Sequence, residues 1–420
     1  MDKIIRPMGN GPFSVRVPGS KSMTHRMLVA ASLALGDSVI ENALNSRDTE
    51  LTREGLSRMG AEIGCEGARF TVKGCGGNLK PYPDPIYLEN SGTSMRLLSA
   101  VAALGKGSYI LTGSKRMRER PVGDLLSALN ALGVSAEALS PGGCPPVRIS
   151  CRPISSDHVY VDCAKSSQFL SALLLIAPYT PKGLTIEVPG ALVSKPYVDM
   201  TVSVMETFGV PVTREGYQKF SVSGKNVYLP GDYVVEPDAS AASYFFAAGA
   251  VSGVPVTVEG VSRSSAQGDM RLLGVLEKMG ATVRESKSGV TVTGGKLKGV
   301  TVDMADMPDV APTLAAVAAY AEGVTRVDNV GHLAVKESNR LTSVVRELSR
   351  MGIEASTDGE SLEIRGGTPR PAAIEVYDDH RMAMSFAVMG LRAPGTLIRE
   401  AKCVKKSFPD FWDEWEKLYG

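Results

Sequence analysis

Apolar and polar positions follow one pattern that recurs along the chain at intervals of just over seventy residues. Each copy ends an amphipathic helix on an apolar residue and a glycine, and then begins a strand. The copies are SRMGAEIGC, NALGVSAEA, ETFGVPVTR, EKMGATVRE and SRMGIEAST, with glycines at Gly60, Gly133, Gly209, Gly280 and Gly352. Glycine at this place is a common left-handed stop of a helix. The pattern therefore predicts five helix ends, each followed by a strand.

A second short segment follows each of these strands and alternates apolar with polar residues, as half-buried strands do. These segments are RFTVKG, PVRISC, KFSVSG, GVTVTG and SLEIRG. The predicted unit is thus helix, strand, turn, strand. Self-similarity at a fixed period indicates a repeat architecture.

A sixth helix, FPDFWDEWEKLYG, has no hairpin after it, while the N-terminal segments DKIIRP and FSVRVP are strands without a partner. We expect these first strands to complete the sixth unit. The result is an α/β fold of two similar domains, each with three repeated units. Residues 1–19 plus 235–420 form a discontinuous domain, and residues 20–234 form the second. A cleft between two such domains is the natural place for an active site.

Composition narrows the class of protein. Hydrophobic residues make up 43% of the chain, charged residues 22%, and the net charge is +1, which argues against a nucleic-acid coat. The six cysteines form no CxxC pair, so reduced thiols are expected rather than a zinc site or disulfides. The N-terminus has no signal-like apolar region, and no apolar stretch is long enough to span a bilayer. These features predict a cytoplasmic protein.

Basic and hydroxyl side chains gather where helices are expected to begin in the first half. In RVPGSKSMTHRML, Lys21 and Ser22 start a helix and Arg26 shares its face, although the glycine that precedes lysine in a phosphate loop is missing. Similar starts contain Gly92, Arg120, Ser166, Ser167, Gln168, Ser194 and Tyr197. Each start taken alone is equally consistent with an ordinary capped helix.

The second half repeats this arrangement and adds carboxylates. The predicted helix starts contain Asp309, Lys336, Glu337, Arg340, Asp379, Arg381, Lys405 and Lys406. If all the helix starts face one cleft, they suit a substrate with more than one phosphate or carboxylate group. Carboxylates near such a substrate are costly unless they transfer protons. Asp309 and Glu337 are therefore our acid and base candidates.

Ten segments, spread in order over nearly the whole chain, resemble the 5-enolpyruvylshikimate-3-phosphate synthase family. They are PGSKSMTHR, NSGTSMR, RERPVGDLL, SSQFLSALLL, SKPYVDMT, DASAASYFF, PDVAPTLA, VKESNRL, DDHRMAM and KKSFPDFW. The resemblance implies two domains of the inside-out α/β barrel type. It also implies transfer of the enolpyruvyl group of phosphoenolpyruvate to the 5-hydroxyl of shikimate 3-phosphate, in the pathway to chorismate and aromatic amino acids. The expected enzyme is a monomer without metal or organic cofactor, and a glyphosate target.

The resemblance also assigns roles to individual residues. Asp309 is expected to take the 5-hydroxyl proton, and Glu337 with Lys21 to manage the proton at the methylene carbon. The expected shikimate 3-phosphate residues are Lys21, Ser22, Arg26, Ser166, Ser167, Gln168, Ser194, Tyr197, Asp309, His332 and Lys336. The expected phosphoenolpyruvate residues are Lys21, Gly92, Arg120, Gln168, Arg340, Arg381 and Lys406.

Two positions depart from the family pattern. His332 stands where members commonly have a substrate-contacting Asn, and Leu97 stands where many have Pro. Gly92 matches the pattern of glyphosate-sensitive members. Two alternative functions are UDP-N-acetylglucosamine enolpyruvyl transfer, which shares the fold and the donor, and a non-enzymatic pseudo-sixfold binding module. The segment TGSKRMRERPVG lacks the reactive Cys typical of the former, and a DNA clamp would need a positive inner surface.

Overall fold

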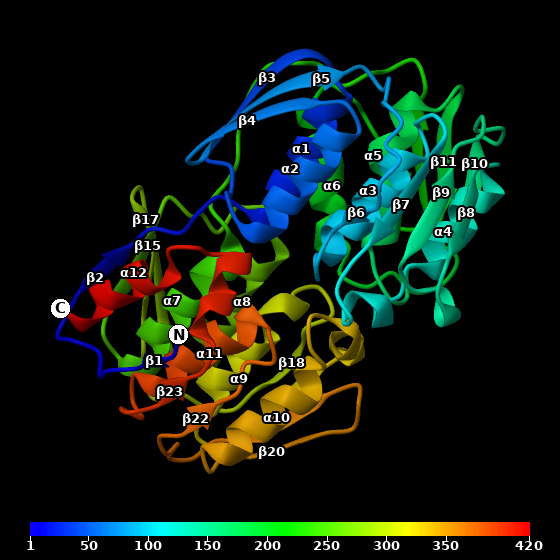
Figure 1. Cartoon of the computed structure of the whole chain (residues 1–420). Coiled ribbons are helices and arrows are strands. Elements are labelled where there is room, and N and C mark those ends of the chain that lie inside the picture. The colour runs from blue at the N-terminus through cyan, green and yellow to red at the C-terminus, as the bar shows by residue number, and fades with distance from the viewer. The chain divides into compact units, whose positions relative to one another are not determined.

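A computed structural model describes all 420 residues, which divide into two compact units (Figure 1). Unit 1 consists of Met1–Pro18 and Pro237–Gly420, and unit 2 consists of Gly19–Glu236. Each unit has an apolar core of its own. The chain therefore passes from one unit to the other twice.

Three four-stranded sheets form the outside of unit 2, with strand orders β14-β3-β5-β4, β6-β7-β9-β8 and β10-β11-β13-β12. In each sheet the first two strands are parallel and the other pairs are antiparallel. The strands are β3 (Leu35–Glu41), β4 (Glu62–Glu66), β5 (Arg69–Cys75), β6 (Ile86–Tyr87), β7 (Ser108–Thr112), β8 (Ser135–Ala138), β9 (Val147–Ser150), β10 (His158–Tyr160), β11 (Gly183–Glu187), β12 (Thr213–Glu215), β13 (Lys219–Ser223) and β14 (Asp232–Val234).

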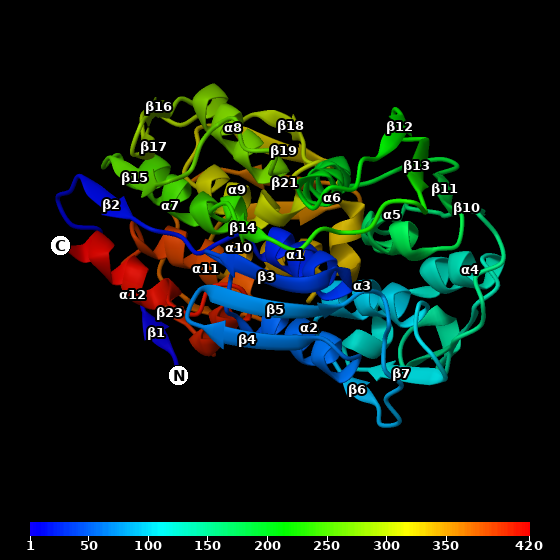
Figure 2. The same cartoon turned by 90° about the horizontal axis from the view of Figure 1, so that it is seen from above.

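Six helices fill the inside of unit 2. They are α1 (Lys21–Leu33), α2 (Arg47–Arg58), α3 (Gly92–Ala102), α4 (Gly123–Ala131), α5 (Gln168–Ile176) and α6 (Lys195–Thr207). Helices α1, α3 and α5 are buried along nearly their whole length and pack on one another. Figure 2 shows β3, β5 and β4 running side by side along α1 and α2. This is an inside-out α/β arrangement, with helices within and sheets outside.

Unit 1 repeats the arrangement, with strand orders β16-β17-β15-β2, β18-β19-β21-β20 and β1-β23-β22. The strands are β1 (Lys3–Ile4), β2 (Phe13–Val15), β15 (Val256–Glu259), β16 (Thr282–Ser286), β17 (Gly289–Thr293), β18 (Thr301–Asp303), β19 (Val324–Asp328), β20 (Glu354–Thr357), β21 (Leu362–Arg365), β22 (Ala373–Ile374) and β23 (Leu397–Ile398). The helices are α7 (Ala239–Ser252), α8 (Leu272–Met279), α9 (Ala311–Ala318), α10 (Arg340–Arg350), α11 (His380–Gly390) and α12 (Phe411–Glu416). The buried helices here are α7, α9 and α11.

The predicted helix stops and second strands are confirmed. All five glycines have a positive φ, between 79° at Gly352 and 116° at Gly60, and the five second segments are strands β5, β9, β13, β17 and β21. The complete repeat is larger than the pattern indicated. Each repeat begins with an outer strand and a buried helix. The buried helix was missed because it is apolar on all sides, so its sequence shows no alternation of apolar and polar residues at the helical period.

The expectation that both N-terminal strands complete the sixth unit is wrong for the second of them. Strand β1 does pair with β23, antiparallel, but β2 pairs in parallel with β15 of the fourth unit. In unit 2 the corresponding outer strand is β14, which pairs in parallel with β3. At the two crossings, Ser20 N donates to Glu236 O at 2.7 Å and Asp238 N donates to Pro18 O at 2.8 Å. Unit 2 is thus inserted between an outer strand of unit 1 and the helix that normally follows such a strand.

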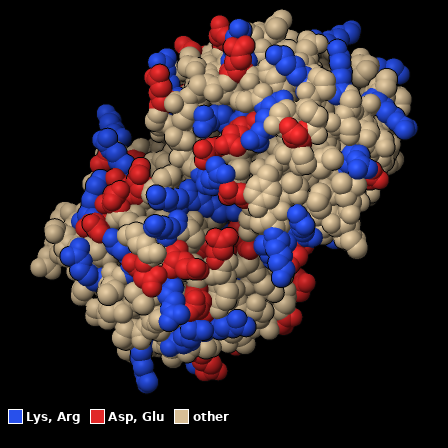
Figure 3. Space-filling view, in the orientation of Figure 1, with Lys and Arg blue, Asp and Glu red and all other residues tan.

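Positive and negative side chains are intermixed on the visible surface. Figure 3 shows Lys and Arg side chains interspersed with Asp and Glu across both units. None of the helices combines the length and the apolar composition that crossing a membrane requires.

Gly366, directly after β21, tests how closely the backbone there packs against the segment that follows α9. A methyl carbon added at Gly366 would lie 1.7 Å from the carbonyl oxygen of Ala321, which is fixed backbone. We expect Gly366→Ala to lower the free energy of unfolding by roughly 3 kcal/mol, because backbone must shift. Urea denaturation measures this. The control Gly274→Ala lies within α8 with nothing near the added carbon and should change stability by less than roughly 1 kcal/mol. Equal stabilities of the two variants would contradict the packing described.

Candidate active site

Arg340, the first residue of α10, is the centre of a charged cluster in unit 1. Its side chain is 1% exposed. It donates from Nε to Asp379 Oδ2 at 2.8 Å, from Nη2 to Glu337 Oε2 at 2.8 Å and from Nη1 to Asp309 Oδ1 at 3.0 Å. A buried cation needs such partners because leaving water is costly. Three carboxylates from separate segments are therefore fixed around one guanidinium.

Asp309 joins two further cations. Arg381 Nη2 donates to its Oδ2 at 2.7 Å, and Lys336 Nζ lies 3.9 Å from its Oδ1. Burial by itself raises the pKa of the Asp309 carboxyl. The positive charges of Arg381, Lys336 and Arg340 outweigh burial, so the pKa lies well below its usual value. The carboxylate is therefore ionised at neutral pH.

The predicted residues of unit 1 are thus mostly brought together: Asp309, Lys336, Glu337, Arg340 and Arg381 form one cluster. His332 lies within electrostatic range of Lys336 and Asp309. Burial and the charge of Lys336 lower the pKa of its imidazole to about 4, and its buried Nε2 has no hydrogen-bond partner. Lys406 ends the short 3-10 helix over Ala401–Lys406 and is half-buried.

In unit 2, Lys21 is the first residue of α1 and is 9% exposed. Its Nζ lies 3.5 Å from Oδ2 of the buried Asp48, in the first turn of α2. The lysine is therefore held at a helix start by a carboxylate from the next helix. Ser22 follows it and is half-buried.

Arg26 is more enclosed than its predicted binding role suggests. Its side chain donates from Nε to Thr201 Oγ1 at 2.7 Å, from Nη1 to Ser22 O at 2.8 Å, and from Nη2 to Tyr197 O at 3.1 Å and Ser171 Oγ at 3.3 Å. These acceptors are uncharged, and burial lowers the pKa of Arg26 to about 10. The guanidinium therefore links α1 to both α5 and α6.

Gly92 and Arg120 lie directly against each other. Arg120 Nη1 donates to Asn90 O at 2.8 Å and to Asn90 Oδ1 at 3.1 Å. This places the guanidinium over the start of α3, where a methyl carbon added at Gly92 would lie 2.5 Å from Nη2. The absence of a side chain at Gly92 thus makes room for Arg120.

Gln168 at the start of α5 is oriented from two sides. Its Nε2 donates to Thr93 Oγ1 at 3.0 Å, and its Oε1 accepts from Arg96 Nη1 at 2.7 Å. The neighbouring Ser166 Oγ accepts from Gln168 N at 3.3 Å. Ser167, Ser194 and Tyr197 also lie at starts, of α5 and α6.

Comparisons with known proteins identify the family to which the chain belongs. A family model described as EPSP synthase (3-phosphoshikimate 1-carboxyvinyltransferase) matches residues 10–415. The chain belongs to this family. Two similar relatives carry the name 3-phosphoshikimate 1-carboxyvinyltransferase. The protein of Trichormus variabilis is 42% identical with all of both chains covered, and that of Klebsiella pneumoniae is 41% identical, covering 99% of this chain and 98% of the relative.

Solved structures of the EPSP synthase family show the same fold. An EPSP synthase from Acinetobacter baumannii at 2.37 Å superposes with a TM-score of 0.82 at 29% identity, covering all of this chain and 98% of that one. A second structure of EPSP synthase from the same organism gives a TM-score of 0.81 at 28% identity. The family match favours the shikimate reaction over UDP-N-acetylglucosamine transfer and over a non-enzymatic module.

Several residues that position the predicted site residues were given no binding or catalytic role from the sequence. Asp379 is fully buried, binds Arg340 and caps α11 by accepting from Arg381 N at 3.0 Å. Its position directly before a predicted helix was the one sequence feature that could have indicated a positioning role for Asp379. Asp48 in the first turn of α2 pairs with Lys21, and Arg96, the fifth residue of α3, donates to Gln168 Oε1.

Asp269 is a further buried carboxyl beside this cluster. It accepts a hydrogen bond from Ser240 Oγ, which in turn lies 3.4 Å from Arg381 Nη2. Its Oδ1 is buried without a hydrogen-bond partner. Burial, together with the negative charge of Asp309, raises the pKa of Asp269 to about 7 despite the opposing charge of Arg381. Nothing in its sequence context, QGDMR, indicated this.

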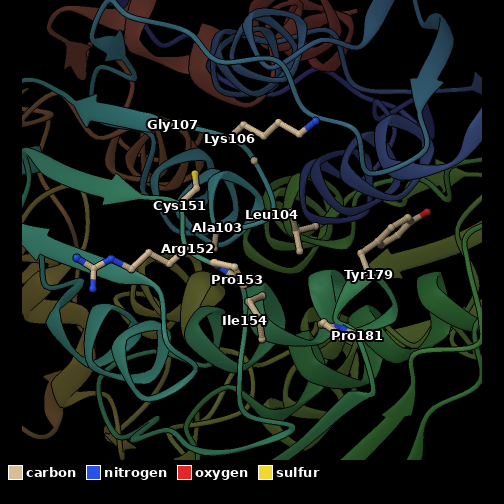
Figure 4. A pocket seen from close by; sticks show the side chains of 11 residues that line it. Ala103, Leu104, Lys106, Gly107, Cys151, Arg152, Pro153, Ile154, Tyr179 and Pro181 are labelled. Carbon is tan, nitrogen blue, oxygen red and sulfur yellow. The ribbon is translucent and has the colours of Figure 1, made fainter.

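A separate pocket of about 430 Å³ lies in unit 2, away from these helix starts. It is lined by Ala103, Leu104, Gly105, Lys106, Gly107, Cys151, Arg152, Pro153, Ile154, Tyr179 and Pro181 (Figure 4). None of the predicted site residues lines it. It also has no carboxylate that could serve as an acid or base.

The raised pKa of Asp269 predicts a pH dependence of stability. An acid with a pKa of about 7 in the folded chain and 3.8 when unfolded binds its proton more tightly in the folded state. Its contribution to stability is complete below about pH 4 and is lost as the pH rises through 7. We expect the free energy of unfolding to fall more steeply between pH 4 and 7 in the wild type than in Asp269→Asn. Urea titrations at several pH values measure this, and parallel curves would refute it.

Proposed function

We propose that the helix-start residues of units 1 and 2 carry out the 3-phosphoshikimate 1-carboxyvinyltransferase reaction in this chain. The chain is an enzyme of this class, and its substrates are shikimate 3-phosphate and phosphoenolpyruvate. The enolpyruvyl group moves to the 5-hydroxyl and phosphate leaves. The observation that carries the residue assignment is the cluster at Arg340, which together with two further cations meets three carboxylates.

Phosphoenolpyruvate carries a phosphate and a carboxylate, and both anions suit planar guanidinium groups. We assign to it Lys21, Gly92, Arg120 and Gln168 of unit 2 and Arg340, Arg381 and Lys406 of unit 1. The close approach of Arg120 to Gly92 supports the first set. The second set is supported by Arg340 and Arg381, whose guanidinium groups already bind carboxylates.

Shikimate 3-phosphate offers a phosphate, a carboxylate and hydroxyls. We assign to it the hydroxyl and amide side chains at the starts of α5 and α6, together with cations. The full set is Lys21, Ser22, Arg26, Ser166, Ser167, Gln168, Ser194, Tyr197, Asp309, His332 and Lys336. At neutral pH His332 is an uncharged imidazole, which like Asn can both donate and accept a hydrogen bond.

Asp309 is the proposed base for the 5-hydroxyl proton. In the free chain its pKa is held well below its usual value by Arg381, Lys336 and Arg340, so it is ionised but weakly basic. The anionic groups of phosphoenolpyruvate compete for the same guanidinium groups. This competition weakens the field on Asp309 and raises its pKa, which makes the carboxylate a better base when the donor is bound.

Glu337, with Lys21, is proposed to manage the proton at the methylene carbon. Addition to that double bond requires protonation, and elimination of phosphate from the tetrahedral intermediate returns the proton. Glu337 and Asp309 are both fixed by Arg340 but come from different segments of unit 1. The proposed chemistry uses proton transfer and ion binding, without a metal or organic cofactor.

We also propose that the enzyme acts as a monomer in the cytoplasm. The six free cysteines suit a reducing compartment, and the two units each have a complete core.

Phosphate release tests the function and the base together. Wild-type protein with both substrates should release phosphate without added metal, and UDP-N-acetylglucosamine should not replace shikimate 3-phosphate. We expect Asp309→Asn to lower kcat by roughly a hundredfold or more, as for a lost proton-transfer group. The control Asp306→Asn removes a nearby carboxylate that pairs with Arg271 and should keep wild-type turnover. Full activity in Asp309→Asn would remove it as the base, and activity only with UDP-N-acetylglucosamine would overturn the function.

The contact of Gly92 with Arg120 predicts a selective loss of donor binding. The added carbon in Gly92→Ala would lie 2.5 Å from Arg120 Nη2 and must displace the guanidinium. We expect the KM for phosphoenolpyruvate and the inhibition constant of glyphosate to rise roughly tenfold or more, because small displacements in a site are costly. The KM for shikimate 3-phosphate should stay within about twofold. Steady-state kinetics measures all three.

The matched control is Gly123→Ala at the start of α4. There the added carbon would make only ordinary contact, 3.5 Å from Gly143, so wild-type constants are expected. If Gly92→Ala behaved like this control, Arg120 would not belong to the donor site.

A further inference from the structure

The loop between β22 and α11 has an unusual backbone. Tyr377 and Asp378 are successive residues with positive φ, of 56° and 53°. Side chains larger than glycine rarely adopt this conformation, and two in a row must be held by their surroundings. The loop leads directly into Asp379, which binds Arg340. Whatever holds the loop therefore also determines where Asp379 lies.

One buried carboxylate holds this loop. Glu347 is fully buried within α10. Its Oε1 accepts from the Tyr377 hydroxyl at 2.5 Å, and its Oε2 accepts from Glu375 N at 3.1 Å. Both oxygens of Glu347 thus bind the loop, one at a side chain and one at the backbone.

The same helix holds the other end of the loop. Arg340 lies two turns before Glu347 and on the same face of α10, and it donates to both oxygens of Asp379, at 2.8 Å and 3.2 Å. The strained residues Tyr377 and Asp378 lie between Glu375 and Asp379, whose hydrogen bonds attach the loop to α10. The loop is therefore fixed to α10 through Glu347 and through Arg340.

We infer that Glu347 and Tyr377 are positioning residues for donor binding: their hydrogen bond holds the 375–379 loop so that Asp379 orients Arg340 and the start of α11. This inference rests on the proposed function, in which Arg340 and Arg381 bind phosphoenolpyruvate. Neither Glu347 nor Tyr377 contacts a residue assigned to substrate. Asp379 transmits their effect, because it binds Arg340 and also caps α11 at Arg381 N.

Tyr377→Phe removes only the hydroxyl and is the direct test. A hydrogen bond to a charged group is stronger than one between neutral groups, so its loss should raise the KM for phosphoenolpyruvate about tenfold. The KM for shikimate 3-phosphate should change less than about twofold. Glu347→Gln leaves one acceptor oxygen for the Tyr377 hydroxyl and the Glu375 amide and should act in the same direction. It also removes the charge that pairs with Arg350 Nε at 3.3 Å, so Tyr377→Phe is the cleaner of the two variants. The double variant should show less than the product of the two effects, because both remove one interaction.

Tyr320→Phe is the matched control. Its hydroxyl donates to Met389 O at 2.6 Å, at the far end of α11 in the same unit. It removes a tyrosine hydrogen bond to a neutral acceptor without touching the loop. We expect a smaller loss of stability by urea denaturation than in Tyr377→Phe, and wild-type KM values for both substrates.

Amide hydrogen exchange gives a readout that needs no activity. In Tyr377→Phe, the amides of Glu375, Asp379 and Arg381 should exchange about tenfold faster than in the wild type. In Tyr320→Phe they should exchange at the wild-type rate. Matching KM values and exchange rates in the two variants would overturn the inference. An inactive wild type would overturn the proposed function alone, since the exchange of these amides would still decide whether the hydrogen bond holds the loop.

Discussion

The architecture of unit 1 around its site depends on one buried cation. Arg340 is almost completely removed from water, and three carboxylates surround it. Losing any one of them would leave charge buried without compensation, which costs far more than an exposed ion pair contributes. The segments before α9, before α10 and before α11 must therefore arrive at the same place together. The contacts that stabilise unit 1 are therefore the same contacts that place the charged groups of the site.

The repeat explains how distant segments meet that requirement. Asp309 precedes α9, Arg340 begins α10, and Asp379 precedes α11. In unit 2, Lys21, Gly92 and Gln168 begin α1, α3 and α5 in the same way. Asp309 and Asp379 occupy equivalent positions because α9 and α11 are buried helices that each follow an outer strand, whereas α10 is the partly exposed helix that lies between them along the chain. Helix starts also attract anions through their free N–H groups. The repeat therefore brings several anion-binding helix starts to the same end of each bundle.

Local sequence patterns predicted most of the secondary structure and the helix starts of the site. They failed for interactions between residues that lie far apart along the chain. Glycine stops, second strands and most helix starts follow from nearby residues, and the structure has them where the pattern placed them. The pairing of β2 with β15 does not, because it joins residues separated by the whole of unit 2. Similarly, nothing near Arg26 or Asp269 indicates that one is enclosed by uncharged acceptors and the other has a raised pKa. Those properties come from the surrounding packing. The family resemblance supplied individual roles that composition and spacing alone left open.

The insertion of unit 2 into unit 1 has a consequence for how the chain folds as it is made. Unit 2 is continuous and can fold once Glu236 has left the ribosome. Unit 1 cannot, because β1 is synthesised first and its partner β23 begins only at Leu397. At about 5 to 20 residues per second, β1 is without its partner for roughly 20 to 80 seconds. Unpaired strands invite aggregation, and very short ones invite it least. Strand β1 has only two residues, which suits a segment that stays unpaired for this long. Strand β2 has three residues and a shorter interval, because its partner β15 begins at Val256.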